Sequence, residues 1–496
     1  MNINTTTMLA VLNELKKYNL VDNYSKKYDF NSIIIDDITY NSNEIAGNAL
    51  FFCKGMSFKP KYLIDAVNNG AVAYISETLY ADVTTIPFIK VNDVRKAMSV
   101  VAVLFYQRAF DDFNLVGITG TKGKTTTTYF LKSIIDNYTK SQSAVLSTVE
   151  VFTGSRCERA RLTTPESIDL QKYFYETKQN NIKYLTMEVS SQAYKLNRVF
   201  SVHFDIGIFL NIGEDHISPI EHSDFNDYLS CKLEFLRNCD TVIVNGESDE
   251  IKRVMEAATE KSKKVITYGT SNRFDYYTDN IIRHDDGYTF DVNKGDYKKN
   301  FKITIQGRFN VENALAAIIT AKELGIDDES IYNGLEATKV VGRMNIFENN
   351  GKTVIVDFAH NYVSFLRLYE SIKLDYPDKN IVVLFGCVGG KSYNRRRDVA
   401  VLAGRNASYI YLTADDPQFE DVKTICDNIA MYIKPFGVSY EIIEDREVAI
   451  KTAIENADKN DIIVIAGKGE ENYQKIKGKS VPYPSDITIV KECLGL

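Results

Sequence analysis

A glycine-rich stretch at residues 115–138 combines the residue types that bind phosphate. An apolar segment at its start has the character of a buried strand, Gly120 and Gly123 follow it, and an amphipathic segment with helical spacing comes next. Glycines let backbone N–H groups approach phosphate oxygens, and the N-terminus of a following helix adds partial positive charge. Lys124 can reach terminal phosphates, and the Thr125 hydroxyl can hold Mg²⁺. We interpret the stretch as a variant phosphate-binding loop; the alternative is a glycine turn before an ordinary helix.

Other polar side chains stand where predicted strands end. Glu188 follows a strand-like segment at 184–187, and His216 follows another at 204–210. In open α/β sheets, ligands gather at the carboxyl ends of the strands, and a carboxylate suits Mg²⁺. The alternatives are a helix cap or surface carboxylate for Glu188 and a structural role for the histidine. Lys232, in a helical segment, reads by itself as a solvated lysine whose stem covers apolar neighbours.

A basic cluster follows a glycine-rich turn in the last third of the chain. It consists of Lys391, Arg395, Arg396 and Arg397. Guanidinium groups bind phosphate or carboxylate in a bidentate manner, so the cluster could clamp an anion. The alternative is the solvated first turn of a helix, and the sequence leaves both open.

Composition narrows the class of protein. The 496 residues carry a net charge of −7, with 44% hydrophobic residues and no long block of one sign. Nucleic-acid binding needs a basic face, so we predict no nucleic-acid partner. Seven scattered cysteines without CxxC spacing are typical of free thiols. The N-terminus lacks an apolar signal core and no apolar run could span a membrane, so we predict a cytoplasmic protein without a membrane partner.

A chain of this length should contain more than one domain, and the element pattern suggests three. We place them at residues 1–105, 106–340 and 341–496. The first has strand and helix signals but no catalytic constellation, which indicates a binding module. In the third, apolar strands alternate with helices, which predicts a mainly parallel, doubly wound α/β sheet.

Ten segments spread over nearly the whole chain resemble the Mur ligases, the ATP-dependent amide-forming enzymes of peptidoglycan precursor synthesis. They are GTKGKTTT (120–127), LTTPESIDL (162–170), MEVSSQAYKLNR (187–198), FLNIGEDH (209–216), YLSCK (228–232), GRFNVENALAA (307–317), GRMN (342–345), VDFAHN (356–361), TADDPQFED (413–421) and AGKGEENYQ (466–474). The set is most similar to the branch that adds the third residue of the peptide. Within that branch, the segments GTKGKT, LTTPESIDL and TADDP are most similar to those of the enzymes that add L-lysine. The resemblance implies an α/β fold of three domains: a small UDP-binding domain, a central P-loop ATPase domain with a parallel sheet, and a C-terminal Rossmann-like domain.

The resemblance also implies a reaction. ATP, with Mg²⁺, phosphorylates the D-glutamate carboxylate of UDP-MurNAc-L-Ala-D-Glu; the amine of L-lysine then attacks the acyl phosphate, and phosphate leaves. Such chemistry depends on charge neutralisation and positioning, so cations and a phosphate loop should dominate the site. The implied protein is a monomer that acts in cell-wall synthesis, cell shape and cell division.

Motif by motif, the resemblance implies a nucleotide and metal site. The implied catalytic residues are Lys124, Lys232, Glu188 and His216. The implied metal ligands are Thr125, Glu188, His216 and Lys232, the last carbamylated to N6-carboxylysine. The implied ATP contacts are Gly120, Thr121, Lys122, Gly123, Lys124, Thr125, Thr126, Asn313, Arg343, Asp357 and Asn361.

It implies two further sites as well. The UDP-MurNAc-dipeptide contacts are Ser42, Thr163, Thr164, Ser190 and Arg198. The contacts to the incoming amino acid are Asp415, Asp416, Gln418 and Glu471.

The chain departs from the family pattern at several positions. The uridine motif, usually Asp-Ser-Arg, is here Asn41-Ser42-Asn43, and Val363 stands where an acidic residue is common. Diaminopimelate enzymes place an Arg where this chain has Gln418, which cannot form a charged fork with a distal carboxylate. The extra carboxylate of Asp416 favours an ammonium, so both features indicate lysine.

Two other hypotheses stay open at this stage. The departures in the uridine motif would suit a paralogue that joins another amino acid, such as meso-diaminopimelate, to a muramoyl or different carboxylate. A non-catalytic nucleotide-binding scaffold is the alternative outside enzymes, and the presence of Lys124, Thr125, Glu188, His216 and Lys232 argues against it.

Overall fold

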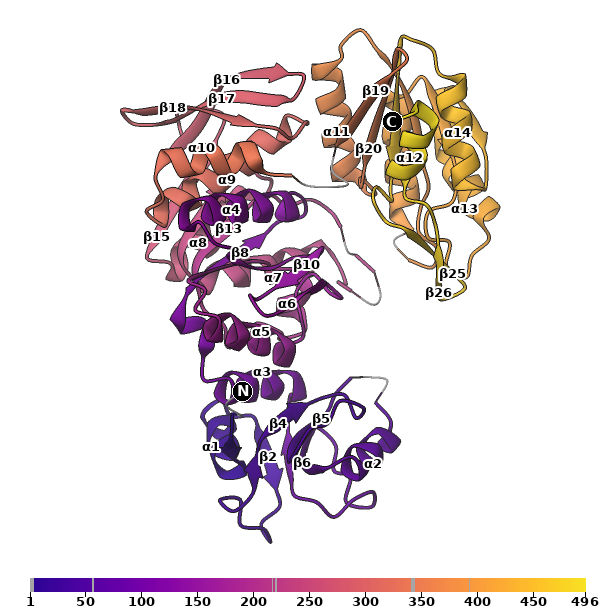
Figure 1. Cartoon of the computed structure of the whole chain (residues 1–496). Helices are drawn as coiled ribbons and strands as arrows, with labels where there is room; N and C mark the ends of the chain where they lie inside the picture. The colour runs from indigo at the N-terminus through magenta and orange to yellow at the C-terminus, as the bar shows by residue number, and fades with distance from the viewer. Residues whose placement is uncertain (1–3, 56–57, 216, 219–220, 340–343, 392) are drawn as a thin grey trace.

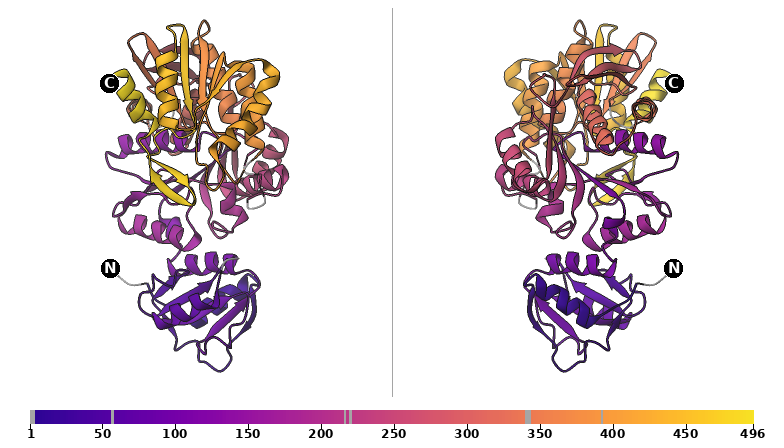
Figure 2. Two further views of the ribbon diagram at one scale, coloured as in Figure 1. Left: turned by 90° about the vertical axis from the view of Figure 1, so that its right-hand side faces the viewer. Right: turned by 90° about the vertical axis from the view of Figure 1, so that its left-hand side faces the viewer.

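Three α/β units, each with its own sheet, follow one another along the chain (Figure 1). The computed structural model describes residues 4–55, 58–215, 217–218, 221–339, 344–391 and 393–496. We name the units the first, central and C-terminal domains. In Figure 1 the first domain lies at the bottom, the central domain above it and the C-terminal domain at the upper right. The two side views separate the first domain from the other two, which pack together (Figure 2).

The first domain is a five-stranded sheet of order β2-β7-β6-β5-β4, parallel except for β2. Its strands are β2 (Val21–Tyr24), β4 (Asp37–Thr39), β5 (Ala49–Cys53), β6 (Ala71–Ser76) and β7 (Phe88–Val91), with β1 (Thr6–Thr7) and β3 (Ile34–Ile35) as a separate pair. Its helices are α1 (Met8–Lys17), α2 (Pro60–Asn68) and α3 (Val94–Phe105). The Asp93 side chain caps the start of α3 by accepting a hydrogen bond from the Lys96 N–H.

The central domain has an eleven-stranded sheet of order β11-β10-β9-β12-β8-β13-β14-β15-β16-β17-β18. Its predominantly parallel part comprises β8 (Asn114–Thr119), β9 (Ala144–Leu146), β12 (Tyr184–Glu188), β13 (Phe204–Phe209), β14 (Cys239–Asn245) and β15 (Lys264–Gly269), and β10 (Glu150–Phe152) and β11 (Cys157–Arg159) extend one edge. Its helices are η1 (Ala109–Asp112), α4 (Lys124–Thr139), α5 (Ser167–Gln179), α6 (Ser191–Lys195), α7 (Phe225–Arg237), α8 (Ile251–Lys261), α9 (Phe309–Glu323) and α10 (Asp328–Ala337).

Both faces of this parallel sheet are buried. Leu115 of β8 belongs to the core on the α5 and α7 side, whereas its neighbour Val116 belongs to the core on the α4 and α9 side. Alternate side chains of a strand point to opposite faces, so a strand covered by helices on both sides must be apolar throughout. The continuous apolar run before the phosphate loop is explained by this double covering.

An antiparallel meander at the other sheet edge was missed by the sequence analysis. It consists of β16 (Tyr276–His284), β17 (Gly287–Lys294) and β18 (Tyr297–Ile303). Along β17 the buried side chains of Tyr288, Phe290 and Val292 alternate with polar residues, which is the period-two pattern of a half-buried strand. The turn dipeptides Asp286-Gly287 and Gly295-Asp296 were the available signal for hairpins.

The C-terminal domain has a six-stranded sheet of order β19-β20-β24-β21-β22-β23, in which only β19 runs antiparallel. The predicted doubly wound sheet is confirmed. Its strands are β19 (Asn345–Asn349), β20 (Lys352–Asp357), β21 (Asn380–Phe385), β22 (Tyr409–Leu412), β23 (Ser439–Ile442) and β24 (Asp461–Ala466), with a hairpin of β25 (Tyr473–Ile476) and β26 (Lys479–Pro482). Its helices are α11 (Tyr362–Asp375), α12 (Asn394–Asn406), α13 (Val422–Ile433), η2 (Lys434–Phe436), α14 (Arg446–Asn456) and α15 (Asp486–Leu494).

The fold class predicted from the sequence is confirmed, and the residue numbers chosen for the domain boundaries stay a prediction. Within the described residues, no helix has both the length and the apolar character needed to cross a membrane.

Candidate active site

The phosphate loop joins β8 to α4 in the predicted strand–loop–helix order. Gly123 precedes α4 with φ +89°, and a Cβ there would lie 2.3 Å from Oδ1 of Asn313. Only glycine fits this combination of backbone angle and close approach. The loop is braced from β13, because the Asn211 side chain accepts from the Lys122 N–H at 2.9 Å and donates to the Lys122 carbonyl at 3.0 Å.

Thr125 and Glu188 form one polar centre beside the loop. The Thr125 hydroxyl donates to Oε1 of Glu188 at 2.9 Å. Thr148 contributes two more donors to this carboxylate, its N–H to Oε1 at 2.9 Å and its hydroxyl to Oε2 at 3.0 Å. Glu188 is fully buried, so the interpretation as a surface carboxylate is wrong. A hydroxyl and a carboxylate beside a phosphate loop are the oxygen donors that Mg²⁺ prefers.

Lys232 comes from α7 and reaches the first residues of the loop. Its Nζ donates to the carbonyl of Gly120 at 3.0 Å and to Oγ1 of Thr119 at 3.3 Å. The side chain is 2% exposed, so the interpretation as a solvated lysine is wrong. Burial, and secondarily the charge of Lys124, holds the pKa of Lys232 well below its usual value. A neutral amine in such a place is a nucleophile.

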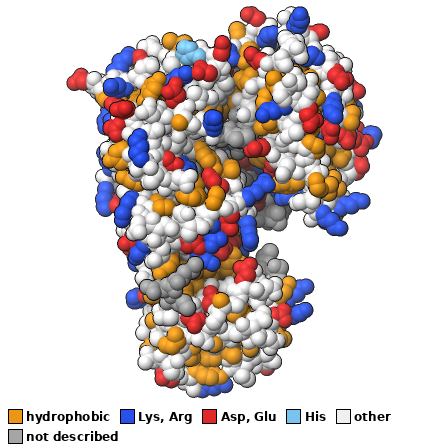
Figure 3. Space-filling view, viewed as in Figure 1, with side chains coloured by type: hydrophobic (Ala, Val, Ile, Leu, Met, Phe, Trp, Pro, Cys, Tyr) orange, Lys and Arg blue, Asp and Glu red, His pale blue; other side chains and the backbone are white. Residues whose placement is uncertain are grey.

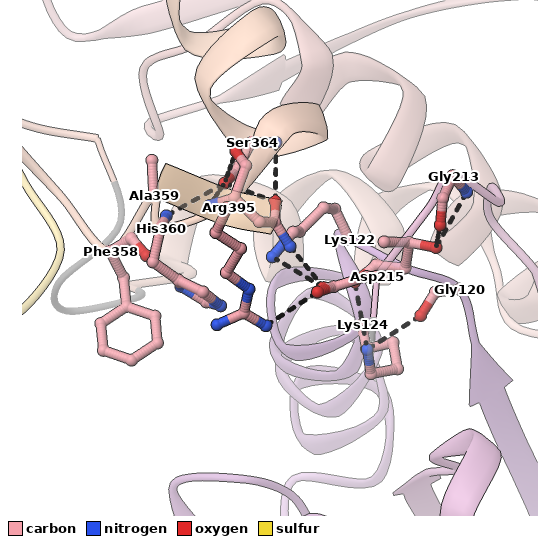
Figure 4. Close-up of polar contacts among 12 residues, drawn as sticks. Gly120, Lys122, Lys124, Gly213, Asp215, Phe358, Ala359, His360, Ser364 and Arg395 are labelled. Carbon is pink, nitrogen blue, oxygen red and sulfur yellow. Dashed lines mark hydrogen bonds and ion pairs between the residues drawn. The ribbon is translucent and has the colours of Figure 1, made fainter. Parts of the chain in front are cut away.

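Asp215 connects the central domain to the C-terminal domain (Figure 4). Its Oδ1 is 2.8 Å from Nη2 of Arg395, and its Oδ2 accepts a hydrogen bond from the Asn361 amide. Nζ of Lys122 lies 3.8 Å from the same carboxylate. Of the basic cluster, Arg395 therefore faces the phosphate loop, while Arg396 pairs with Glu420.

Residues of both domains line one cavity of about 240 Å³. The central domain supplies the phosphate loop from Thr121 to Thr126 together with Glu188 and Asn313. The C-terminal domain supplies Asp357 and the segment 358–360, and burial holds the pKa of His360 well below its usual value. The cavity lining thus includes most of the described residues predicted to contact ATP and metal; Gly120, Asn361 and Lys232 do not line it, but Asn361 contacts Asp215 of the lining and Lys232 contacts Gly120 next to Thr121. His216 and Arg343 lie outside the described residues.

The residues predicted for the dipeptide gather at the carboxyl end of β12. The Thr164 hydroxyl donates to the Glu188 carbonyl at 2.9 Å and lies 3.2 Å from Oγ of Ser190. Arg198 donates to the Thr164 carbonyl at 3.1 Å, and Thr163 lines the cavity with the phosphate loop.

Ser42 lies apart from this group, in the first domain. Its carbonyl accepts a hydrogen bond from the Asn69 side chain at 2.8 Å. Its neighbour Asn41 lines a second cavity of about 510 Å³ between the first and central domains, together with Tyr40, Tyr173 and Lys172. The space-filling view shows a notch between the first and C-terminal domains, with Lys and Arg side chains along its upper edge (Figure 3).

The residues predicted for the incoming amino acid cluster around Lys468, to which the sequence analysis gave no role of its own. Nζ of Lys468 lies 2.8 Å from Oδ1 of Asp416 and 2.7 Å from Oε2 of Glu471. The sequence predicts that Asp416 favours the ammonium of a substrate; in the structure the ammonium beside Asp416 is that of Lys468, a residue of this chain. Burial raises the pKa of Asp415, against the opposing effect of Lys468. Gln418 adopts φ +55° and its N–H donates to the Lys475 carbonyl of β25.

Two family models match the chain. The Mur ligase middle domain matches residues 118–321, and the Mur ligase glutamate ligase domain matches residues 342–469. Solved structures with the same fold include a UDP-N-acetylmuramoyl-L-alanyl-D-glutamate–2,6-diaminopimelate ligase, with a TM-score of 0.67, 23% identity and 99% of both chains covered. Another is the MurF ligase of Thermotoga maritima in complex with ADP, with a TM-score of 0.58 and 18% identity, covering 87% of this chain and 93% of that chain.

Curated relatives match over nearly the whole length. The chain is 38% identical to the UDP-N-acetylmuramoyl-L-alanyl-D-glutamate–L-lysine ligase of Streptococcus pneumoniae serotype 2, covering 98% of this chain and 99% of that protein. It is 36% identical to the protein of the same name from Enterococcus faecalis, with 98% of both covered. With the two family models and these full-length relatives, the chain belongs to the Mur ligase family.

Proposed function

We propose that the protein uses ATP to join the amine of L-lysine to the D-glutamate carboxylate of UDP-MurNAc-L-Ala-D-Glu. The observation that carries the proposal is the cavity between two domains, which has a phosphate loop on one wall and the C-terminal domain on the other. The lysine specificity is supported by the names of the relatives at 36–38% identity. Peptidoglycan precursor synthesis in the cytoplasm, by a monomer, belongs to the same proposal, as do roles in cell shape and division.

The phosphate loop binds the ATP phosphates in this proposal. Lys124 and the N-terminus of α4 offset the negative charge, and Gly123 lets the backbone approach. A substrate carboxylate oxygen attacks the γ-phosphorus, the bond to the bridging oxygen breaks, and ADP leaves. The lysine nitrogen then attacks the acyl carbon, the bond from carbon to the phosphate oxygen breaks, and the amine loses a proton.

Mg²⁺ would be held by Thr125 and Glu188, whose buried oxygens fit a hard cation. Bound there, it would neutralise phosphate charge. Lys232 is proposed to carry a carboxylate: its neutral amine nitrogen bonds to the carbon of CO₂ and loses one proton, which leaves a metal-binding carbamate where the buried amine stood. His216 is proposed as a further ligand from its sequence match alone.

The amino-acid site is proposed at Asp415, Asp416, Gln418 and Glu471. These three carboxylates with Lys468 leave two negative charges in excess, which favours a substrate side chain with an ammonium. Gln418 offers no cation for a second carboxylate. Both features support lysine over diaminopimelate.

Phosphate release in the presence of UDP-MurNAc-L-Ala-D-Glu and ATP tests the proposal. L-lysine, meso-diaminopimelate and no amino acid are compared in parallel, with mass spectrometry of the product. We expect turnover with lysine. Turnover with diaminopimelate alone would preserve the reaction but overturn the specificity, and no turnover with either would favour a ligase for a different carboxylate, as the altered motif at Asn41 and Asn43 would then suggest.

A further inference from the structure

Three cations from two domains converge on Glu166. Its Oε2 lies 2.7 Å from Nζ of Lys54 and 3.5 Å from Nη1 of Arg95, which both belong to the first domain. Its Oε1 lies 3.1 Å from Nη2 of Arg198, which belongs to the central domain. One carboxylate therefore links a residue of the predicted dipeptide site to the first domain.

The cluster is largely withdrawn from water. The side chains of Lys54, Glu166 and Arg198 are 13%, 12% and 9% exposed. Burial would raise the pKa of Glu166, but Lys54 and Arg198 hold it below its usual value, so the carboxylate is ionised at neutral pH. Ion pairs in such surroundings are weakly screened, and removal of one partner leaves a buried charge uncompensated.

Glu166 fixes the orientation of Arg198. The guanidinium has two acceptors, Oε1 of Glu166 and the carbonyl of Thr164. The two acceptors, Thr164 and Glu166, belong to the loop that also carries Thr163. The Thr164 hydroxyl contacts Ser190. The direction in which Arg198 presents its remaining N–H groups is thus set by the Glu166 carboxylate.

Further contacts beside the cluster hold the first domain against the central domain. The Tyr40 hydroxyl of the first domain donates to Oδ2 of Asp169 at 2.6 Å, and Nζ of Lys54 lies 4.0 Å from the Tyr40 ring centre. The Asn197 amide, next to Arg198, donates to Oδ2 of Asp93 at 3.3 Å. A displacement of the first domain would therefore reach Arg198 through Lys54 and Glu166.

The charges of the cluster do not balance. In the described part of the chain, Glu166 is the one carboxylate within 4.0 Å of Lys54, Arg95 or Arg198, so two positive charges have no carboxylate in direct contact; Asp169, which interacts with Lys54 from farther away, accepts the hydrogen bond of Tyr40. A cluster with only a structural role would gain from neutrality, whereas an excess of positive charge suits an anionic substrate.

We propose that Glu166 is a positioning residue, which holds the Arg198 guanidinium in the orientation that receives a carboxylate of the substrate dipeptide, and that Lys54 couples this orientation to the first domain. The inference rests on the proposed function, because it assigns UDP-MurNAc-L-Ala-D-Glu to this site.

Steady-state kinetics of full-length Glu166→Gln and Lys54→Met variants test the inference. We expect KM for UDP-MurNAc-L-Ala-D-Glu to rise about 10-fold or more, while KM for ATP and for L-lysine stays within about twofold. Lys178→Met is the matched control, since it removes a 2.8 Å ion pair with Asp112 of η1 without touching the cluster. Its KM values should equal those of the wild type.

Chemical rescue separates positioning from general stability. In an Arg198→Ala variant, added guanidinium ion, well below denaturing concentrations, should restore activity several-fold, because Glu166 and the Thr164 carbonyl still offer its acceptors. The same ion should fail to rescue the Arg198→Ala/Glu166→Gln double variant. Equal rescue of both variants, or an unchanged KM for UDP-MurNAc-L-Ala-D-Glu in Glu166→Gln and Lys54→Met, would overturn the inference. The proposed function would still stand in that case, provided that the wild type turns over. A wild type without turnover would overturn the proposed function and the inference together.

Discussion

Asp215 and Arg395 form an ion pair of 2.8 Å between the domain that carries the phosphate loop and the domain that covers it. Both side chains are largely buried, at 2% and 14% exposed, and they are 180 residues apart in the chain. Lys122 and Asn361 contact the same carboxylate. The pair therefore joins the two walls of the cavity that the phosphate loop lines.

Substitution of this pair should loosen the cavity. We expect Asp215→Asn and Arg395→Gln each to raise KM for ATP several-fold. The KM of the double variant should not exceed that of the single variant with the higher KM. The coupling energy from this double-mutant cycle should be about 0.5–1 kcal/mol, the size of one several-fold single effect, as for contacting residues in one network. Arg397→Gln is the control, because Arg397 is exposed and pairs with its neighbour Asp398; strictly additive effects would show that the domains are held by other contacts.

Lys232→Met should abolish ligation and yet stabilise the protein. Removal of one group that stabilises charge in the reaction lowers kcat by about 10²-fold or more. The partners of Lys232 stay satisfied, since the Gly120 carbonyl still accepts from Lys124 and the Thr119 hydroxyl still donates to the Val189 carbonyl. A buried amine is thereby replaced by an apolar chain of similar length, so the free energy of unfolding should increase.

The pH dependence of that stability has a defined sign. The pKa of Lys232 lies well below 10.5 in the folded protein and returns to its usual value on unfolding. Between those two pKa values the unfolded chain binds a proton that the folded protein does not, so stability rises with pH in this window. Denaturant titrations at several pH values should show a flatter profile for Lys232→Met. Removal of dissolved CO₂ should lower wild-type activity, with recovery on adding bicarbonate; indifference to CO₂ would speak against carbamylation.

Glu188→Gln should change the requirement for Mg²⁺. The carboxylate is buried and accepts three hydrogen bonds from Thr125 and Thr148, so its geometry is set before a cation binds. We expect the Mg²⁺ concentration for half-maximal activity to rise by about 10–100-fold. Glu176→Gln serves as control, because Glu176 pairs with Arg156 and does not line the cavity. A metal titration identical to that of the wild type would exclude Glu188 as a ligand.

Gln418→Arg should shift the choice of amino acid. Gln418 already has φ +55°, so another non-glycine residue adds no new backbone strain. An arginine there can form a charge-assisted hydrogen bond with a distal carboxylate, worth about 1.5–3 kcal/mol. The ratio of kcat/KM for meso-diaminopimelate to that for L-lysine should therefore rise about 10-fold or more. Phe419→Arg adds the same charge at the exposed neighbouring position, and an equal shift there would attribute the effect to charge alone.

The local features of the fold were well predicted from the sequence. The phosphate loop and the alternating strands and helices of the doubly wound C-terminal sheet each depend on residues close in sequence. The meander at 276–303 was missed although Tyr288, Phe290 and Val292 alternate with polar residues and are buried in the core on the α4 and α9 side, a strand pattern that the sequence does carry.

The sequence by itself determined the phosphate loop and the family, because a contiguous motif carries its own geometry and ordered segments can be matched without coordinates. Only the tertiary structure decided the state of Lys232, the pairing of Asp416 with Lys468, and the link from Lys54 through Glu166 to Arg198. Charge state and ion pairing depend on burial and on distances to groups far along the chain, such as the 112 residues between Lys232 and Gly120. Those distances are set by packing, which no local pattern encodes.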